Sequence, residues 1–238
     1  MMRGLQILIV AVFGWLAASA AAGETAAAEK FLQMTRERAA MQNSFADLRG
    51  NVTHLRRNQG GANTYPIRFV IRFTGSRVQA RLTLFNRESH TFERNLRTRQ
   101  SKTSCDAAGK PLLEELGFRI GDLTMDFLDY PVHSELEGET LKTLSCRVLM
   151  LMSPEKKPVK VWISGEYMFA LKAEFYDSLK NINNKPERTL EITGFKKVKD
   201  YYVATDIALL SKDFRSRIAF KDCQAFSADD PRALAEFK

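Results

Sequence analysis

The residue types that most often carry out chemistry are few and scattered in this chain. The three histidines, His54, His90 and His133, stand apart from one another and from the cysteines. None forms an H-x-x-x-H pair, the spacing that places two metal ligands on one helix face. The sequence also contains no G-x-S-x-G, phosphate-binding loop or G-x-G-x-x-G motif. We therefore expect no catalytic centre, no bound metal and no cofactor, and a protein that is not an enzyme.

Paired carboxylates are the remaining candidates for acid–base chemistry. Asp122 and Asp126 lie four residues apart, so they would share one face of a helical turn. Asp122 directly follows Gly121, in a context typical of a helix N-cap. We interpret Asp122 as a helix cap and not as half of a catalytic pair.

The three cysteines, Cys105, Cys146 and Cys223, are an odd number with spacings too wide for a metal cluster. One disulfide with one free thiol, or no disulfide, is compatible with the sequence. Cys146 lies in the apolar run 145–152, which favours a buried, small hydrophobic side chain.

The N-terminus has the pattern of a secretory signal peptide. Arg3 precedes an apolar run, Leu5 to Leu16, and small residues follow at 17–23. Ala18-Ser19-Ala20 fits an A-x-A cleavage site, and residues 20–22 offer a second register. The apolar run is shorter than the roughly 20 residues that span a bilayer, so a retained anchor is the weaker alternative. We predict a cleaved signal peptide over residues 1–22 and a soluble protein in a bacterial periplasm.

The charge and length limit the function further. The 238 residues carry a net charge of +8, which suits either a solubilising role or contact with anionic lipid headgroups. Secretion argues against a nucleic-acid partner. Without the signal peptide the chain remains long enough to bury a core without disulfides.

The hydrophobic pattern predicts a mainly β protein. A helix is expected over 26–45, and strict alternation marks strands at 65–73 and 77–85. Short helical turns are expected at 111–116 and 122–127, and the tail from 227 is a short helix or disordered. Further strands are expected at 91–99, 142–152, 159–164, 167–176, 189–196, 201–208 and 215–220. The predicted fold class is α+β, mainly β: a single, strongly curved antiparallel sheet, an open and incomplete β-barrel, with helices covering its concave face. Residues 23–226 form the domain, and residues 227–238 form the C-terminal tail.

Apolar side chains on these strands are expected to face inward. They form either an ordinary core or the lining of a cavity for an acyl chain, since a curved sheet of this size can enclose one ligand. Met150 and Met152 suit both. The candidate ligand-binding residues are Ile67, Phe69, Ile71, Phe73, Leu82, Leu84, Val161, Ile163, Phe169, Leu171 and Phe175.

A series of motifs follows in order over residues 115–222. Its segments are Gly121-Asp122-Leu123, residues 146–151, Ser153-Pro154, and residues 159–163, 167–177, 192–195 and 202–206. The series includes a W-I strand, a Y-x-x-L-x-x-E-x-Y-D strand and a later glycine-containing strand. This order resembles the outer-membrane lipoprotein-sorting proteins, the LolA/LolB-like group, and in particular its divergent LolA-like branch.

This resemblance implies a carrier that does no chemistry. It implies an open barrel closed by helices, with an apolar cavity that binds the acyl chains of a lipoprotein or lipid and ferries them toward the outer membrane. An inner-membrane transporter and an outer-membrane acceptor are the implied protein partners. Trp162 occupies the family's tryptophan position, although alternation turns it away from Val161 and Ile163.

The alternative is a non-carrier periplasmic binding module, or an accessory subunit of an envelope transporter, on the same scaffold. A carrier requires a cavity lined by the apolar strand faces. A binding module is instead expected to have a filled core and an exposed interaction patch.

Overall fold

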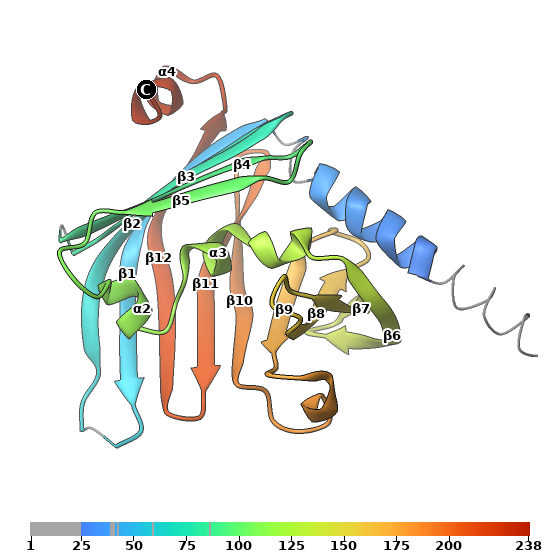
Figure 1. Ribbon diagram of the computed structural model, residues 1–238. Helices are drawn as coiled ribbons and strands as arrows, with labels where there is room; N and C mark the ends of the chain where they lie inside the picture. Colours follow the sequence, from blue (N-terminus) through green and yellow to red (C-terminus); the bar gives the residue numbers. More distant parts are fainter. Residues whose placement is uncertain (1–24, 39–40, 42, 59, 86) are drawn as a thin grey trace, which may run out of the picture.

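The computed structural model describes residues 25–238 apart from 39–40, 42, 59 and 86. The predicted signal peptide, residues 1–22, lies outside the described residues. The chain forms one antiparallel sheet of 12 strands in the order β5-β4-β3-β2-β1-β12-β11-β10-β9-β8-β7-β6 (Figure 1). The strands are β1 (Ser44–Arg56), β2 (Asn63–Thr74), β3 (Arg77–Leu84), β4 (Glu88–Asn95), β5 (Ser101–Cys105), β6 (Val132–Leu141), β7 (Leu144–Met152), β8 (Pro158–Ser164), β9 (Ala170–Phe175), β10 (Arg188–Val198), β11 (Tyr201–Ser211) and β12 (Phe214–Ser227).

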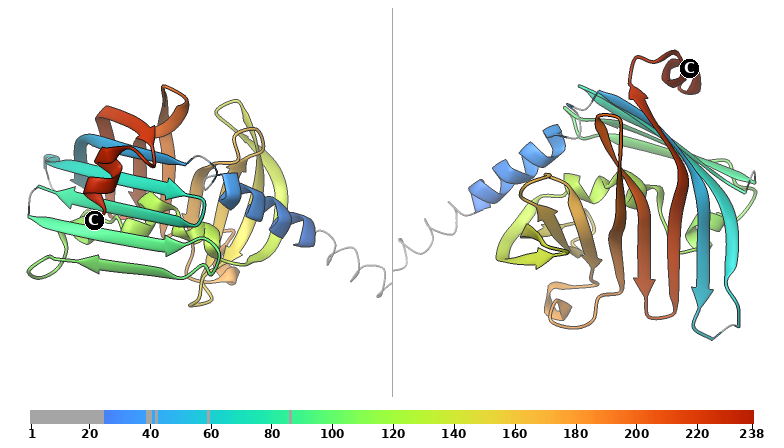
Figure 2. Two further views of the ribbon diagram at one scale, coloured as in Figure 1. Left: turned by 90° about the horizontal axis from the view of Figure 1, so that it is seen from above. Right: turned by 180° about the vertical axis from the view of Figure 1, so that it is seen from behind.

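The sheet is strongly curved and is not closed, because β5 and β6 are its two edges (Figure 2). The chain passes from β5 directly to β6, so residues 106–131 must cross from one edge of the sheet to the other. We call these residues the crossing segment. It contains α2 (Leu112–Glu115), α3 (Ile120–Thr124) and the 3-10 helix η1 (Asp126–Asp129), and it runs over the concave face (green in Figure 1). The predicted fold class is confirmed.

Alternation along the strands builds the core on the concave side. In β3, Val78, Ala80, Leu82 and Leu84 are at most 1% exposed, whereas the residues between them are partly exposed. Burying a large aliphatic side chain contributes about 1.5–3 kcal/mol, so this face of the sheet is the main source of stability.

The N-terminal helix, residues 25–38, packs against the end of the crossing segment. Its apolar side holds Ala28, Phe31 and Leu32, which are buried. Arg36 donates hydrogen bonds to the carbonyl oxygens of Leu128 (2.6 Å) and Tyr130 (3.2 Å). The helix thereby fixes the position of the chain just before β6.

The C-terminal helix α4 (Pro231–Glu236) lies on the convex side of the sheet (Figure 2). Ala233 is fully buried there in a small cluster with Phe45 and Val70, and Phe237 packs edge-on against Phe45. Of the two states considered for the tail, the helix is the one observed.

Three strands were not predicted, and their sequences show why. The predicted helix takes in the first two residues of β1, and no element is predicted for the rest of it, because its outward positions carry Asp47, Arg49 and Asn51, and Gly50 interrupts the pattern. All five residues of β5 are exposed, and in β6 five of the ten residues are exposed and only one is buried. Edge strands bury little surface, so they show no alternation. The helix predicted over 26–45 is therefore wrong at its end, where Ser44 and Phe45 begin β1.

Gly50 sits at a register shift between β1 and β12. A Cβ atom at this position would collide with the backbone oxygen of Ala219. We expect Gly50→Ala to lower the free energy of unfolding by about 1–3 kcal/mol, as overpacking does elsewhere, measured by urea denaturation. Gly60→Ala is the matched control, because nothing lies within 4 Å of a Cβ at that position. Equal midpoints for the two variants would contradict the prediction.

Candidate functional site

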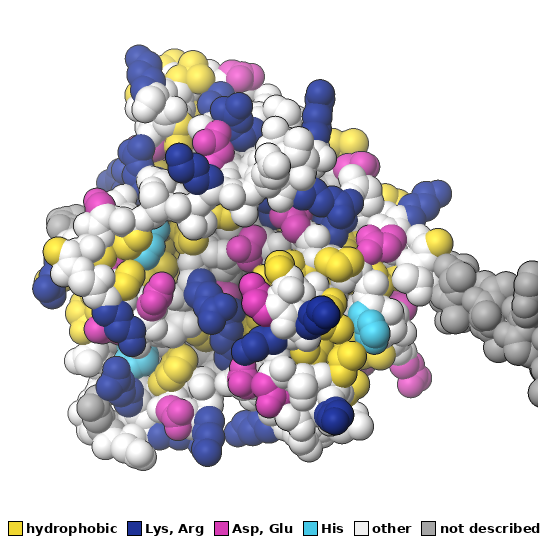
Figure 3. All heavy atoms as spheres, in the orientation of Figure 1, with side chains coloured by type: hydrophobic (Ala, Val, Ile, Leu, Met, Phe, Trp, Pro, Cys, Tyr) yellow, Lys and Arg dark blue, Asp and Glu magenta, His cyan; other side chains and the backbone are white. Residues whose placement is uncertain are grey.

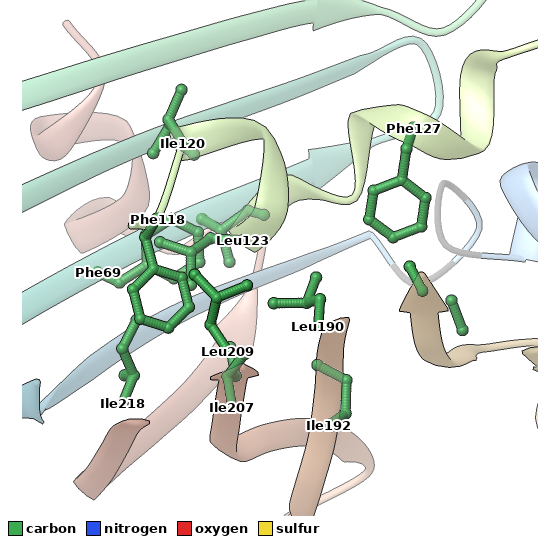
Figure 4. Packing of buried hydrophobic residues seen from close by; sticks show 14 of the residues in the cluster. Phe69, Phe118, Ile120, Leu123, Phe127, Leu190, Ile192, Ile207, Leu209 and Ile218 are labelled. Carbon is green, nitrogen blue, oxygen red and sulfur yellow. The ribbon is translucent and has the colours of Figure 1, made fainter. Parts of the chain in front are cut away.

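The crossing segment packs its apolar side chains onto the concave face of the sheet. Its buried residues are Leu113, Leu116, Phe118, Ile120, Leu123 and Phe127. Figure 4 shows several of them directed toward side chains of the sheet, among them Phe69, Leu190, Ile192, Ile207, Leu209 and Ile218. An acyl chain held on the concave face would lie at this interface, so the predicted ligand-binding residues are expected to line it.

The structure brings ten of the eleven predicted ligand-binding residues into this one core. Three of them, Phe73, Phe169 and Phe175, are partly buried against it. The other seven are buried within it: Ile67, Phe69, Ile71, Leu82, Leu84, Val161 and Ile163. That these residues bind a ligand remains a proposal, taken up below.

Leu171 does not face the concave side, so its predicted orientation is wrong. Between β8 and β9, Trp162 pairs with Lys172 and Ile163 with Ala170, which leaves Leu171 as the extra residue of a bulge. A bulge redirects one side chain to the other face of the sheet. Leu171 accordingly packs on the convex side with Cys146, Val148 and Trp162. The prediction that Trp162 faces away from Val161 and Ile163 is confirmed.

Two hollows adjoin the concave core. A hollow between Phe127, Ala170 and Leu190 has no room for a water molecule. The larger hollow is a cleft of about 450 Å³ beside the crossing segment. Polar and charged side chains mix with apolar ones in its lining, which includes Asp126, Tyr130 and Phe175. Charged groups of both signs lie over the corresponding face of the molecule in Figure 3.

Several polar contacts fasten the crossing segment to the sheet. The Ser216 hydroxyl on β12 donates a hydrogen bond to the carbonyl oxygen of Leu116 (2.6 Å), and three further contacts involve charged side chains of the sheet. In the first, the carboxylate of Glu88 on β4 accepts hydrogen bonds from the backbone N–H groups of Leu112 (2.6 Å) and Leu113 (2.8 Å) at the start of α2. Glu88 is buried, so this contact is shielded from water.

The second contact joins α3 to β10, since Arg188 donates two hydrogen bonds of 2.8 Å to the carboxylate of Asp122. Asp122 also accepts a hydrogen bond from the backbone N–H of Arg119 (2.8 Å). Arg119 is the N-cap residue of α3 and Asp122 is the third residue of the helix. The interpretation of Asp122 as the N-cap is therefore wrong: the carboxylate bonds back to the cap residue from inside the helix.

The third contact joins η1 to β4, because Arg94 donates a hydrogen bond to Asp129 (2.9 Å). The sequence analysis missed Glu88, Arg94 and Arg188. A signal for two of them was present, since Glu88, His90, Phe92 and Arg94 occupy alternate positions and all are buried. Polar residues at inward strand positions indicate polar partners inside the fold.

Asp126 lines the cleft in an unusual electrostatic environment. Burial, followed by the neighbouring Asp122 carboxylate, raises the pKa of Asp126 to about 6. Burial and then Asp126 raise the pKa of Tyr130 to about 12. At neutral pH the cleft therefore holds a poorly solvated carboxylate beside a protonated phenol.

Two of the three histidines make hydrogen bonds within the fold, and the cysteines form no disulfide. His54 is hydrogen-bonded to Ser216 (2.8 Å) and His90 to Glu88 (2.9 Å), whereas His133 is exposed. All three cysteines are free thiols, and Cys146 is buried as predicted. Within the described ranges, no group of three or more His, Cys, Asp or Glu side chains is arranged to hold a metal ion. No helix in the same part of the chain is long and apolar enough to span a membrane.

No protein-family model matches this chain, and no curated protein matches its sequence. Its fold is similar to that of a DUF1329 family protein from Desulfovibrio piger ATCC 29098, with a TM-score of 0.60 and 12% identity over 87% of this chain and 94% of that one. It is also similar to a putative outer membrane lipoprotein-sorting protein domain from Vibrio parahaemolyticus, with a TM-score of 0.58 and 14% identity over 87% and 95% of the two chains. A LolA superfamily protein from Nitrosomonas europaea aligns with a TM-score of 0.47 and 16% identity over 82% and 92%. The resemblance to lipoprotein-sorting proteins is thus confirmed at the level of the fold.

Proposed function

We propose that this protein is a periplasmic carrier that holds the acyl chains of a lipoprotein or lipid between the concave face of its sheet and the crossing segment, and ferries them toward the outer membrane. The observation that supports this most is the construction of the crossing segment. Its helices are only four and five residues long, too short to be stable alone. Its position depends on apolar packing against the concave face and on a few polar contacts. Because the packing is apolar, displacing the segment would expose a continuous apolar surface.

Energetics favour an exchange between the crossing segment and an acyl chain. Burying a methylene group contributes about 0.8 kcal/mol, so a long acyl chain gains on the order of 10 kcal/mol from a dry apolar site. Displacing the six buried apolar side chains of the crossing segment costs a comparable amount, about 9–18 kcal/mol at about 1.5–3 kcal/mol each, and the polar contacts add to this. A near balance of these two terms permits both uptake and release, which a carrier needs.

The predicted signal peptide and the fold shared with a lipoprotein-sorting domain support a periplasmic location. In this proposal residues 23–226 are the carrier domain, and α4 adds to its convex side. The inner-membrane donor and outer-membrane acceptor follow from the same proposal, since a carrier needs both.

Quenching by brominated acyl chains tests the proposal, because bromine quenches only tryptophan residues that lie close to it. Phe118 faces the concave core, whereas Trp162 lies on the convex side. We would titrate the exported protein and a Phe118→Trp/Trp162→Phe variant with a brominated fatty acid. We expect saturable quenching of the tryptophan at position 118 and little quenching of Trp162. Phe127→Trp serves if the first variant does not fold.

Two outcomes would overturn the carrier proposal. The first is quenching of Trp162 alone, which would place the ligand on the convex side. The second is no saturable quenching of the tryptophan at position 118 in a folded variant. Leu171→Ala is the matched control for destabilisation, because it removes a buried side chain from the convex cluster and leaves the concave face intact.

A second candidate function, a non-carrier binding module, has its own support. The hollow between Phe127, Ala170 and Leu190 has no room for a water molecule. Three aromatic side chains, Tyr167, Phe195 and Tyr202, are 42–57% exposed. The Tyr167 and Tyr202 rings lie 6.1 Å apart, and Phe195 lies 5.1 Å from Phe169. Exposed apolar patches of this kind mark interaction surfaces. A failed acyl titration would favour this second function.

A further inference from the structure

Asp126 differs from the two aspartates beside it. Asp122 is paired with Arg188, and Asp129 with Arg94. Asp126 lines the cleft and makes no hydrogen bond or ion pair to any residue that the structure describes. The hydroxyl of Tyr130, which lines the same cleft, likewise has no hydrogen-bond partner in the described part of the chain.

Three local features position the Asp126 carboxyl group. Met125, between α3 and η1, has a left-handed φ of 53°, which is strained for a residue with a side chain. A Cβ atom on Gly121 would overlap the Asp126 carboxyl group, so a larger residue there would displace that side chain. The carboxyl group is partly buried beside the cleft, and no described residue donates a hydrogen bond to it in exchange for the water it loses. Local costs that converge on one group are typical of binding sites, where a ligand offsets them.

The cleft is acidic although the chain is basic overall. Its lining contains three basic residues, Arg119, Lys157 and Arg188, and five acidic residues, Glu114, Asp122, Asp126, Glu155 and Glu187. The whole chain carries a net charge of +8. A local excess of negative charge in a recessed site attracts cations more strongly than the same charges on an open surface.

We propose that this cleft binds a primary ammonium group, with Asp126 accepting a charge-assisted hydrogen bond from it and the Tyr130 hydroxyl accepting a second. An ammonium group supplies three N–H donors and a positive charge, which match the unpaired carboxylate and the unpaired hydroxyl. The ammonium belongs either to an aminophospholipid headgroup or to a small free amine. The site goes beyond the carrier proposal, because the cleft is already present with the crossing segment in place.

Calorimetric titration of the exported protein at pH 8 tests this proposal. The ligands are ethanolamine and lysophosphatidylethanolamine, each compared with its choline counterpart, which carries the same charge without N–H donors. We expect the amine ligand to bind at least tenfold more tightly than its choline counterpart. Asp126→Asn should abolish this preference, and Asp200→Asn, which removes an exposed carboxylate from the β10–β11 turn, should retain it.

Each outcome has a defined meaning. A preference seen only with the lysophospholipid supports the proposal and identifies a lipid headgroup, whereas a preference seen with ethanolamine also supports it and identifies a small amine. Equal binding of amine and choline ligands, binding of neither, or an unchanged preference in Asp126→Asn would overturn it. Uptake of the brominated fatty acid without any amine preference would leave the carrier proposal standing while this one fails.

Discussion

Replacing Arg188 with methionine is expected to lower the free energy of unfolding by about 3–5 kcal/mol, the usual cost of leaving one member of a buried ion pair without its partner. The side chain of Asp122 is 3% exposed. Without Arg188 it keeps a single donor, the backbone N–H of Arg119. Methionine replaces much of the apolar stem of arginine but neither of its two donors. Urea denaturation followed by circular dichroism would measure the loss.

Arg217→Met is the matched control for this variant. Arg217 also pairs with an aspartate, Asp206, but its side chain is 58% exposed, and exposed pairs contribute only about 0–1 kcal/mol. Similar small losses in both variants would show that burial of the Asp122–Arg188 pair has no energetic weight. The double variant Arg188→Met/Asp122→Asn should recover part of the loss, because it no longer buries an unpaired charge.

The Arg188→Met substitution also tests whether the crossing segment moves independently of the sheet, as the proposed function requires. Of the three contacts that involve charged side chains of the sheet, only the one between Arg188 and Asp122 joins the crossing segment to β10. The Arg188 guanidinium also lies 4.0 Å from the centre of the Phe175 ring. We expect amide hydrogen exchange in residues 120–124 to accelerate more than exchange in β1 or β12. Uniform acceleration over the whole sheet would mean that the crossing segment does not move independently.

Asp126→Asn is expected to change the pH dependence of stability by about 3 kcal/mol, since one pKa unit corresponds to about 1.36 kcal/mol. The pKa of Asp126 rises from its ordinary value of 3.8 to about 6 in the folded protein, a shift of about 2.2 units. Between these values the folded protein binds a proton that the unfolded chain has released. The contribution of Asp126 to stability is therefore present below about pH 4 and is lost as the pH rises to about 6.

The asparagine variant lacks this loss. Relative to the wild-type protein its stability should rise between about pH 4 and 7 by the amount stated, measured by urea denaturation across that range. The charged groups that act on Asp126 are Asp122 of α3, Arg94 of β4, Asp129 of η1 and Arg188 of β10. All four are retained in the variant, so the difference reports the carboxyl at 126. Leu171→Ala, a destabilised control without a titrating group, should run parallel to the wild type. A parallel profile for Asp126→Asn would contradict the prediction.

The strands of the sheet interior were largely predictable from the sequence. In β3 one residue in two is apolar, and the burial observed follows that alternation. In β2 the same alternation buries Ile67, Phe69 and Ile71, and Val70 is buried in addition in the cluster with Phe45 and Ala233. The physical reason is local: successive side chains of a strand point to opposite faces, so a half-buried strand records its own orientation in its sequence. The same rule correctly predicted that the Trp162 side chain faces away from Val161 and Ile163.

Leu171 shows where this local rule fails. Nothing in residues 169–175 marks the bulge, because the extra residue is defined only by the pairing of β9 with β8. The edge strands β5 and β6 were not predicted for a related reason. They bury so little surface that their sequences need no alternation of apolar and polar residues.

The candidate site was decided by tertiary structure alone. Asp122 and Arg188 are 66 residues apart in the chain, and Glu88 and Leu112 are 24 apart. Their meeting depends on the strand order, which places β5 and β6 at opposite edges and sends the chain between them across the concave face. Hydrophobic alternation is a local property of each strand. The sequence by itself therefore determined a curved, mainly antiparallel sheet with an apolar inner face. Which polar groups meet, and which carboxyl is left without a partner, depends on contacts between distant segments, which exist only once the chain has folded.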